Sequence, residues 1–63
     1  MCEFTVFLEE NGVKKKIAEN VVKAKRKEGK VVLTNASGSF TKVDGATIEV
    51  VDTLMQELIL KKV

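Results

Sequence analysis

The residues of this 63-residue chain with the most distinctive chemistry are Met1, Cys2 and Glu3 at its start. A cysteine thiolate is a soft ligand, which suits late transition metals. The sulfur and the backbone nitrogen of Cys2 are close enough in the covalent structure to close a chelate ring on one metal ion. The sequence therefore offers Cys2, with the Glu3 carboxylate beside it, as a candidate metal site.

The nitrogen donor of that pair depends on what happens to Met1. If Met1 is removed, the nitrogen of Cys2 is a free amine, and if Met1 stays, a deprotonated amide must serve. A square-planar set of nitrogen and sulfur donors favours Ni(II) or Cu(II) over Zn(II). Because one chain supplies a single pair, we expect a two-fold related second chain to complete the set. The alternative is that Cys2 is simply a small buried hydrophobe.

The rest of the composition limits the kinds of metal site and catalytic site that the chain can form. The chain has no His and one Cys, which excludes imidazole metal sites, His-based catalysis and an internal disulfide. Ser37 and Ser39 have no His to activate them, and no glycine-rich phosphate loop is present. We expect Asp44 to shape a turn with Gly45 and Asp52 to cap a later turn. We therefore predict no catalytic residues and a protein that is not an enzyme.

A basic segment forms the second candidate surface. Residues 14–30 carry eight basic and two acidic side chains, a net charge of +6, whereas the other residues carry three basic and seven acidic ones, a net of −4. In a strand, Lys23, Lys25 and Lys27 would point the same way at about 6–7 Å spacing, close to the phosphate spacing of single-stranded nucleic acid. The chain has no Tyr or Trp to stack on bases. A solvated lysine face that protects an edge strand is the alternative.

Glycines mark the turns between short strand-like segments. They follow Asn11, Glu28, Ser37 and Asp44, and type I′ hairpin turns need the positive φ that Asn-Gly and Asp-Gly supply. The intervening segments are rich in Val, Ile and Thr and recur at the roughly 8–12-residue spacing of a small all-β barrel. The predicted strands span residues 2–9, 13–18, 21–27, 30–35, 40–43, 46–51 and 57–61. We predict a single domain over residues 1–63, a small SH3-like antiparallel β-barrel built from hairpins about Gly12, Gly29 and Asp44-Gly45.

Alternation within these strands predicts which side chains face inward. Cys2, Phe4, Val6 and Leu8 share one face of the first strand. The sequence also predicts Phe40, Ile48 and Val50 in the core, with Phe7 and Val51 outward.

Two segments also fit a helix. Thr53 and Gln56 resemble a capping box, so a short helical turn near residues 53–57 competes with a turn followed by a strand, which we favour. Residues 21–28 with Gly29 behind them resemble a helix with a glycine cap. We favour a strand there, because lysines alternate with Val22 and Ala24.

The size of the chain favours assembly. A domain of this length buries only about 60% of its unfolded surface, so we expect a homodimer that covers apolar area and brings the N-termini together. We expect the first strand, Phe7 and Val51 at the interface. No apolar run reaches the roughly 18 residues of a membrane helix, and no signal peptide is evident. With a single unpaired Cys, the sequence predicts a cytoplasmic protein without membrane contact.

Three stretches carry a resemblance over almost the whole chain: MCEFTVFLEENG at the start, Val21-Val22, and VVLTNASGSFTKVDGATIEVVD at residues 31–52. In these the sequence resembles the CooT family of small nickel-binding proteins, members of which are also labelled predicted RNA-binding proteins. The resemblance implies an SH3-like barrel, a homodimer, and Ni(II) held through the cysteine after the initiator Met, which is Cys2 here. The chain departs from the family pattern at Asn20, where many relatives have Asp, and at Met55-Gln56, where relatives carry His or Asn.

The leading hypothesis is therefore a nickel-binding accessory protein, a metallochaperone that stores Ni(II) or hands it to a nickel enzyme or its maturation machinery. A small barrel that binds RNA through Lys23, Lys25 and Lys27 is the alternative. A purely structural subunit that docks through Phe7 and Met55 is the third.

Overall fold

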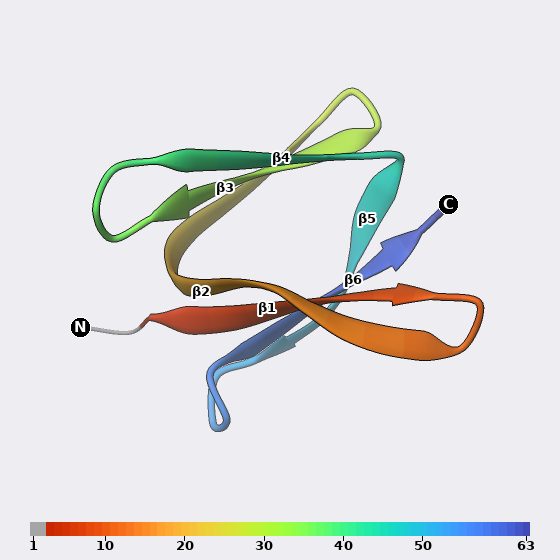
Figure 1. The fold of residues 1–63 in the computed structure, drawn as a ribbon, viewed down its shortest axis with the longest axis horizontal. Helices are drawn as coiled ribbons and strands as arrows, with labels where there is room; N and C mark the ends of the chain where they lie inside the picture. Colours follow the sequence, from red (N-terminus) through yellow and green to blue (C-terminus); the bar gives the residue numbers. More distant parts are fainter. Residues whose placement is uncertain (1–2) are drawn as a thin grey trace.

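The structure, a computed structural model, describes residues 3–63, and within them the chain forms six strands and no helix (Figure 1). The predicted all-β class is confirmed. A turn rather than a helix occupies residues 53–56, and the segment at 21–27 is a strand, as favoured. None of the described residues forms a helix long and apolar enough to cross a membrane. The strands are β1 (Phe4–Glu10), β2 (Val13–Lys27), β3 (Lys30–Asn35), β4 (Phe40–Asp44), β5 (Ala46–Asp52) and β6 (Glu57–Lys62).

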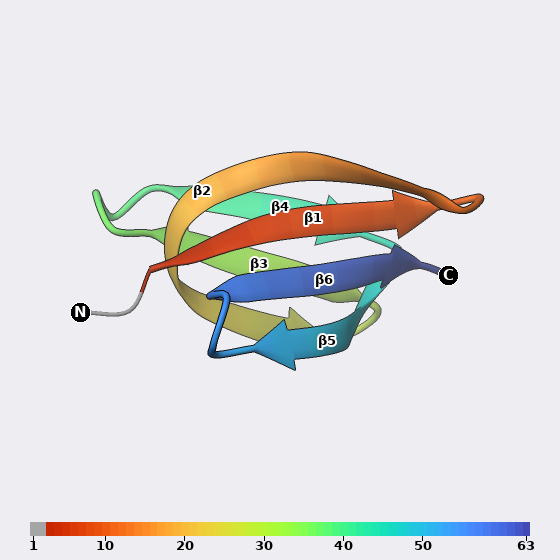
Figure 2. The same cartoon turned by 90° about the horizontal axis from the view of Figure 1, so that it is seen from below.

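The strands form one sheet in the order β4-β3-β2-β1-β6-β5, which curls into a half-barrel around its inner face (Figure 2). This arrangement is consistent with the predicted SH3-like barrel. The expected all-antiparallel pairing is wrong at one place, because β6 runs parallel to β1. The reason is topological: β5 starts at the far edge of the sheet, so β6, which returns along it, ends up running in the direction of β1.

The long β2 strand replaces two predicted strands. Residues 13–18 and 21–27 belong to one 15-residue strand, which bends sharply in Figure 2. Near the bend Asn20 has a φ of 55°, and the register is irregular on both sides. The first half of β2 pairs with β1 and the second half with β3. A residue in the left-handed region redirects the strand without ending it, which explains why its alternation pattern breaks there.

The predicted hairpin about Asp44-Gly45 is also wrong. β4 and β5 lie at opposite edges of the sheet, so the chain turns a corner at Gly45 instead of folding back. Gly45 has a φ of 63°, donates its N–H to the Gly29 carbonyl at 2.9 Å and accepts a hydrogen bond from the Val63 N–H at 2.8 Å. The chain does turn at Asp44. The hairpins predicted about Gly12 and Gly29 are confirmed as β1–β2 and β2–β3, and two further hairpins are β3–β4 and β5–β6.

The core lies inside the curl of the sheet. Phe4 and Leu8 pack against it from β1 and Ile48 from β5, as predicted. Val50 is 42% exposed, contrary to prediction, because an irregularity between Ile48 and Val50 shifts the inward face. Phe40 is 73% exposed, also contrary to prediction. The buried hydrophobic residues are Val6, Val21, Val31, Leu33, Val43, Ala46, Leu58 and Leu60.

Candidate functional site

Of the predicted metal pair, the structure describes Glu3, which directly precedes β1. Cys2 lies outside the described residues. Glu3 is half-buried, and its Oε1 accepts a hydrogen bond from Asn20 Nδ2 at 2.8 Å. Phe4, the next residue, pairs with Val21 of β2. Glu3, the residue that follows Cys2, is therefore hydrogen-bonded to the bend of β2.

Asn20 makes this contact from the left-handed backbone region, with a φ of 55°. Asn adopts positive φ more readily than most residues, and here that conformation coincides with the bend. The Asn20 carbonyl accepts a hydrogen bond from the Ala36 N–H at 2.8 Å, and the neighbouring Glu19 carbonyl accepts one from Asn35 Nδ2 at 2.8 Å. The bend that holds Glu3 is thus itself held by the β3–β4 turn.

The β5–β6 turn supports β1 from the other side. The Thr5 N–H donates to the Gln56 carbonyl at 3.0 Å. Asp52 Oδ1 accepts hydrogen bonds from the Leu54 and Met55 N–H groups at 3.0 and 2.9 Å, so Asp52 caps this turn as expected. The N-terminal end of β1, the β3–β4 turn and the β5–β6 turn lie at one end of the barrel (Figure 2).

Asn20 and Gln56 therefore both lie at this end. Asn20 holds Glu3, and Gln56 is bonded through its carbonyl to Thr5. Asn20 and Asn35 are the residues that sequence reasoning missed. For Asn20 the available signal was an Asn inside a Val-rich strand, because Asn adopts positive φ more readily than most residues.

The donor set of residues 3–63 is too small to hold a metal unaided. Among these residues no group of three or more His, Cys, Asp or Glu side chains lies together. Glu3 brings one carboxylate, which already accepts the Asn20 hydrogen bond. Of the predicted metal pair, residues 3–63 therefore offer a metal ion the single carboxylate of Glu3.

The three predicted lysines lie away from the core on the second half of β2. Lys23, Lys25 and Lys27 are exposed, and Ala24 between them packs against the core. The structure therefore places all three on one outward side of a strand, as their alternation predicted. It does not bring them together with Glu3.

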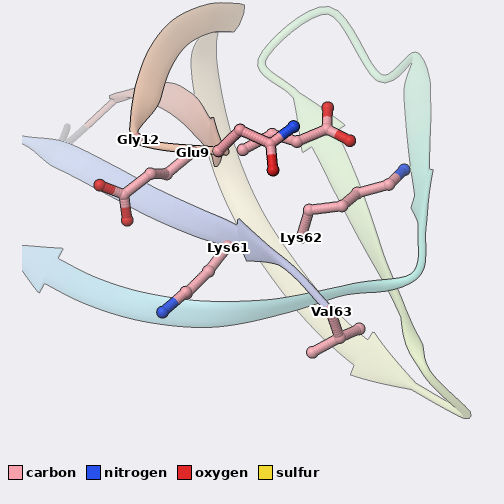
Figure 3. A pocket seen from close by; sticks show the side chains of 7 residues that line it. Glu9, Gly12, Lys61, Lys62 and Val63 are labelled. Atoms are coloured by element: carbon pink, nitrogen blue, oxygen red, sulfur yellow. The ribbon is translucent and has the colours of Figure 1, made fainter.

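An open pocket of about 430 Å³ lies at the opposite end of the barrel, beside the turn at Gly12 (Figure 3). Its charged side chains are of both signs: Glu9 and Glu10 face it from β1, and Lys61 and Lys62 from β6. Lys62 Nζ also donates to the Asp44 carbonyl at 3.2 Å. A mixed, solvent-open set of this kind selects no ligand class, so we assign it no role.

Comparisons with known proteins identify the family. A family model described as the CO dehydrogenase accessory protein CooT matches residues 1–61. Among solved structures, the fold is similar to a crystal structure assigned to CooT from Carboxydothermus hydrogenoformans, with a TM-score of 0.85, 22% identity and 98% of each chain covered. No curated protein matches the chain. The structural likeness supports the fold, and the family match spans almost the whole sequence, so the chain belongs to the CooT family of CO dehydrogenase accessory proteins.

Proposed function

We propose that this protein binds Ni(II) through the Cys2 thiolate and the adjacent backbone nitrogen and hands the ion to a nickel enzyme. The observation that carries the proposal is the match to an accessory-protein family over residues 1–61, a range that includes Met1-Cys2-Glu3. CO dehydrogenase is the recipient that the description of the family indicates. Sulfur and nitrogen donors suit a late transition metal such as Ni(II) as the cargo ion. Because a single unpaired thiol suits a reducing compartment, the proposed exchange takes place in the cytoplasm.

Glu3 supports this site by position rather than by coordination. Its carboxylate is bonded to Asn20, and Asn20 is tied to the β3–β4 turn. The backbone that follows Cys2 therefore starts from a fixed point, which reduces the entropy lost when the chain start closes on a metal ion.

A homodimer would complete the site. Residues 3–63 contain no cluster of side chains that could supply the missing donors, whereas a two-fold related chain would add a second identical sulfur and nitrogen pair. Apolar surface for such an interface exists on β5 and the turn after it, where Val51 is 59% exposed and Met55 63%. Phe7 is less available than expected, because it is half-buried and the Lys14 Nζ lies 5.0 Å from its ring centroid.

Titration with Ni(II) tests the proposal. Wild type should develop a sulfur-to-nickel charge-transfer band, and native mass spectrometry should show one Ni(II) per two chains. Cys2→Ala should lose both the band and the bound metal, while Ser37→Ala, a control at an exposed turn, should bind as wild type does. A Cys2→Ala variant with unchanged affinity would refute the site. A monomer that binds Ni(II) tightly would refute the shared geometry.

A further inference from the structure

The second half of β2 forms a sheet with β3 and β4, and the outer side of this sheet carries five of the eleven basic residues of the chain. Paired residues of neighbouring strands point to the same side, and Val31, Leu33 and Val43 occupy the buried inner side. We call the outer side the lysine face. Its positions form three rows across the strands: Lys23–Thr34–Phe40, Lys25–Val32–Lys42 and Lys27–Lys30–Asp44.

The lysine face is strongly positive. Five of the nine positions are Lys and one is Asp, a net charge of +4. Along β2 the lysines repeat at about 6.8 Å, and the rows extend the charge across strands about 4.8 Å apart. Lys30 and Lys42 were not part of the predicted stripe. The strand register places Lys30 and Lys42 on the same side as the β2 lysines, so the positive charge extends across three strands.

Phe40 supplies the aromatic ring that sequence reasoning did not find on this surface. It begins the edge strand β4, is 73% exposed, and lies in the same row as Lys23, two strand spacings or about 10 Å away. If the lysine face were only a solvated surface, an exposed ring beside the lysines would serve no purpose there. It does provide a surface on which a nucleobase can stack, and such stacking tolerates any base.

We propose that the lysine face binds single-stranded nucleic acid, with phosphates along the lysines of β2 and a base stacked on Phe40. The combination carries the inference: basic side chains at phosphate spacing, extension across three strands, and an exposed ring at the edge where bases would emerge. An acidic protein would also match the charge and could pack against the ring, and the experiment below distinguishes it from nucleic acid. The proposal is independent of the nickel site, since no residue of this face belongs to it.

Fluorescence polarisation with a labelled RNA of about 12 nucleotides tests this at about 50 mM salt. Phe40→Ala should weaken binding about fivefold or more without changing its salt dependence, because it removes stacking alone. The triple variant Lys23→Gln, Lys25→Gln, Lys27→Gln should lower the slope of log affinity against log salt by about 2, because each phosphate that a lysine neutralises contributes about 0.7. The matched control is Lys14→Gln, Lys15→Gln, Lys61→Gln, which removes the same charge near the Gly12 turn and should change the slope little. Circular dichroism checks that each variant is folded.

Four outcomes would overturn the proposal. They are no binding by wild type, equal loss in the two triple variants, an unchanged affinity in folded Phe40→Ala, and full competition by a polyglutamate peptide. The last two would point to an acidic protein partner. Retained RNA binding by Cys2→Ala would separate this activity from nickel binding.

Discussion

Asn20 donates a hydrogen bond through Nδ2 to Oε1 of Glu3 at 2.8 Å and so joins residues 17 positions apart. Asn20 makes this contact from a positive-φ conformation, at the bend where β2 passes from pairing with β1 to pairing with β3. Since Glu3 follows Cys2 directly, the position proposed to bind nickel starts from a constrained point of the barrel wall. In this proposal, strand topology and metal handling are linked through one side-chain amide.

This link makes a prediction about Glu3. Glu3→Gln keeps an oxygen that can accept the Asn20 hydrogen bond and removes the charge, whereas Glu3→Ala removes both. If Glu3 acts by position, Glu3→Gln should bind Ni(II) nearly as wild type does. Glu3→Ala should bind about fivefold more weakly, the equivalent of about 1 kcal/mol. Isothermal titration calorimetry of the three proteins measures the difference.

Asn20→Ala provides the second arm of that experiment. It should weaken Ni(II) binding as much as Glu3→Ala does, and the double variant should be no weaker than either single one, because both remove the same bond. Equal losses in Glu3→Gln and Glu3→Ala would instead make the Glu3 carboxylate a metal ligand.

Gly45 makes the second prediction, on stability. Its φ is 63°, and a Cβ at this position would meet nothing within 4 Å. Gly45→Ala should therefore lower the free energy of unfolding by about 1 kcal/mol through backbone strain alone. Replacement by D-alanine, which prefers positive φ, should not. Urea unfolding of the synthetic proteins at one concentration makes the comparison, and equal stability of both alanine forms would contradict it.

The extents of the strands could be predicted from the sequence because they depend on local signals. Alternation and glycine turns placed β3 (Lys30–Asn35) at its observed bounds and the ends of the other observed strands within a few residues. The exception is the predicted break between residues 18 and 21, which is absent because both segments belong to β2. The predictions that were wrong concern which strands pair with each other, and strand pairing depends on residues that are distant in the sequence. Asp44-Gly45 has the local signature of a hairpin, yet the partner of β5 is β6, and the same Gly serves as a corner.

The same difference between local and long-range information applies to the candidate surfaces. Cys2 and the β2 lysines followed from residue chemistry and spacing, which need no tertiary structure. The Glu3–Asn20 bond and the outward position of Phe40 did not. Phe40 was predicted in the core from its hydrophobicity alone, whereas its pairing with Thr34, next to buried Leu33, puts it on the outer side.

Leu60 makes a prediction about the core. It is fully buried on β6, which pairs with β1 on one side and with β5 on the other. Leu60→Ala should lower the free energy of unfolding by about 3 kcal/mol through reduced burial and a residual cavity. Leu54→Ala, at a turn residue that is 90% exposed, should change it by less than about 0.5 kcal/mol. Urea unfolding at a fixed protein concentration is the measurement, and similar losses in both variants would place the core elsewhere.

Lys16 and Glu19 make the last prediction, on pH. The Lys16 ammonium donates a hydrogen bond to Glu19 Oε2 at 2.6 Å, and this bond, followed by the charge of Lys16, lowers the pKa of the Glu19 carboxyl. Because the folded pKa lies below the unfolded one, the pair contributes stability above the unfolded pKa and loses it as pH falls through the folded pKa. Both side chains are more than half exposed, so salt should weaken the pair.

An NMR titration of the Glu19 carboxyl resolves this pair directly. In Lys16→Gln the pKa of Glu19 should rise toward its ordinary value, and in wild type it should rise in the same direction in about 1 M salt. Lys15→Gln removes the same charge from the neighbouring position and should leave the pKa of Glu19 nearly unchanged. The backbone at Glu19 should not respond, because its carbonyl is held by Asn35 Nδ2 independently of the side chain. A pKa that stays low in Lys16→Gln would assign the shift to another group.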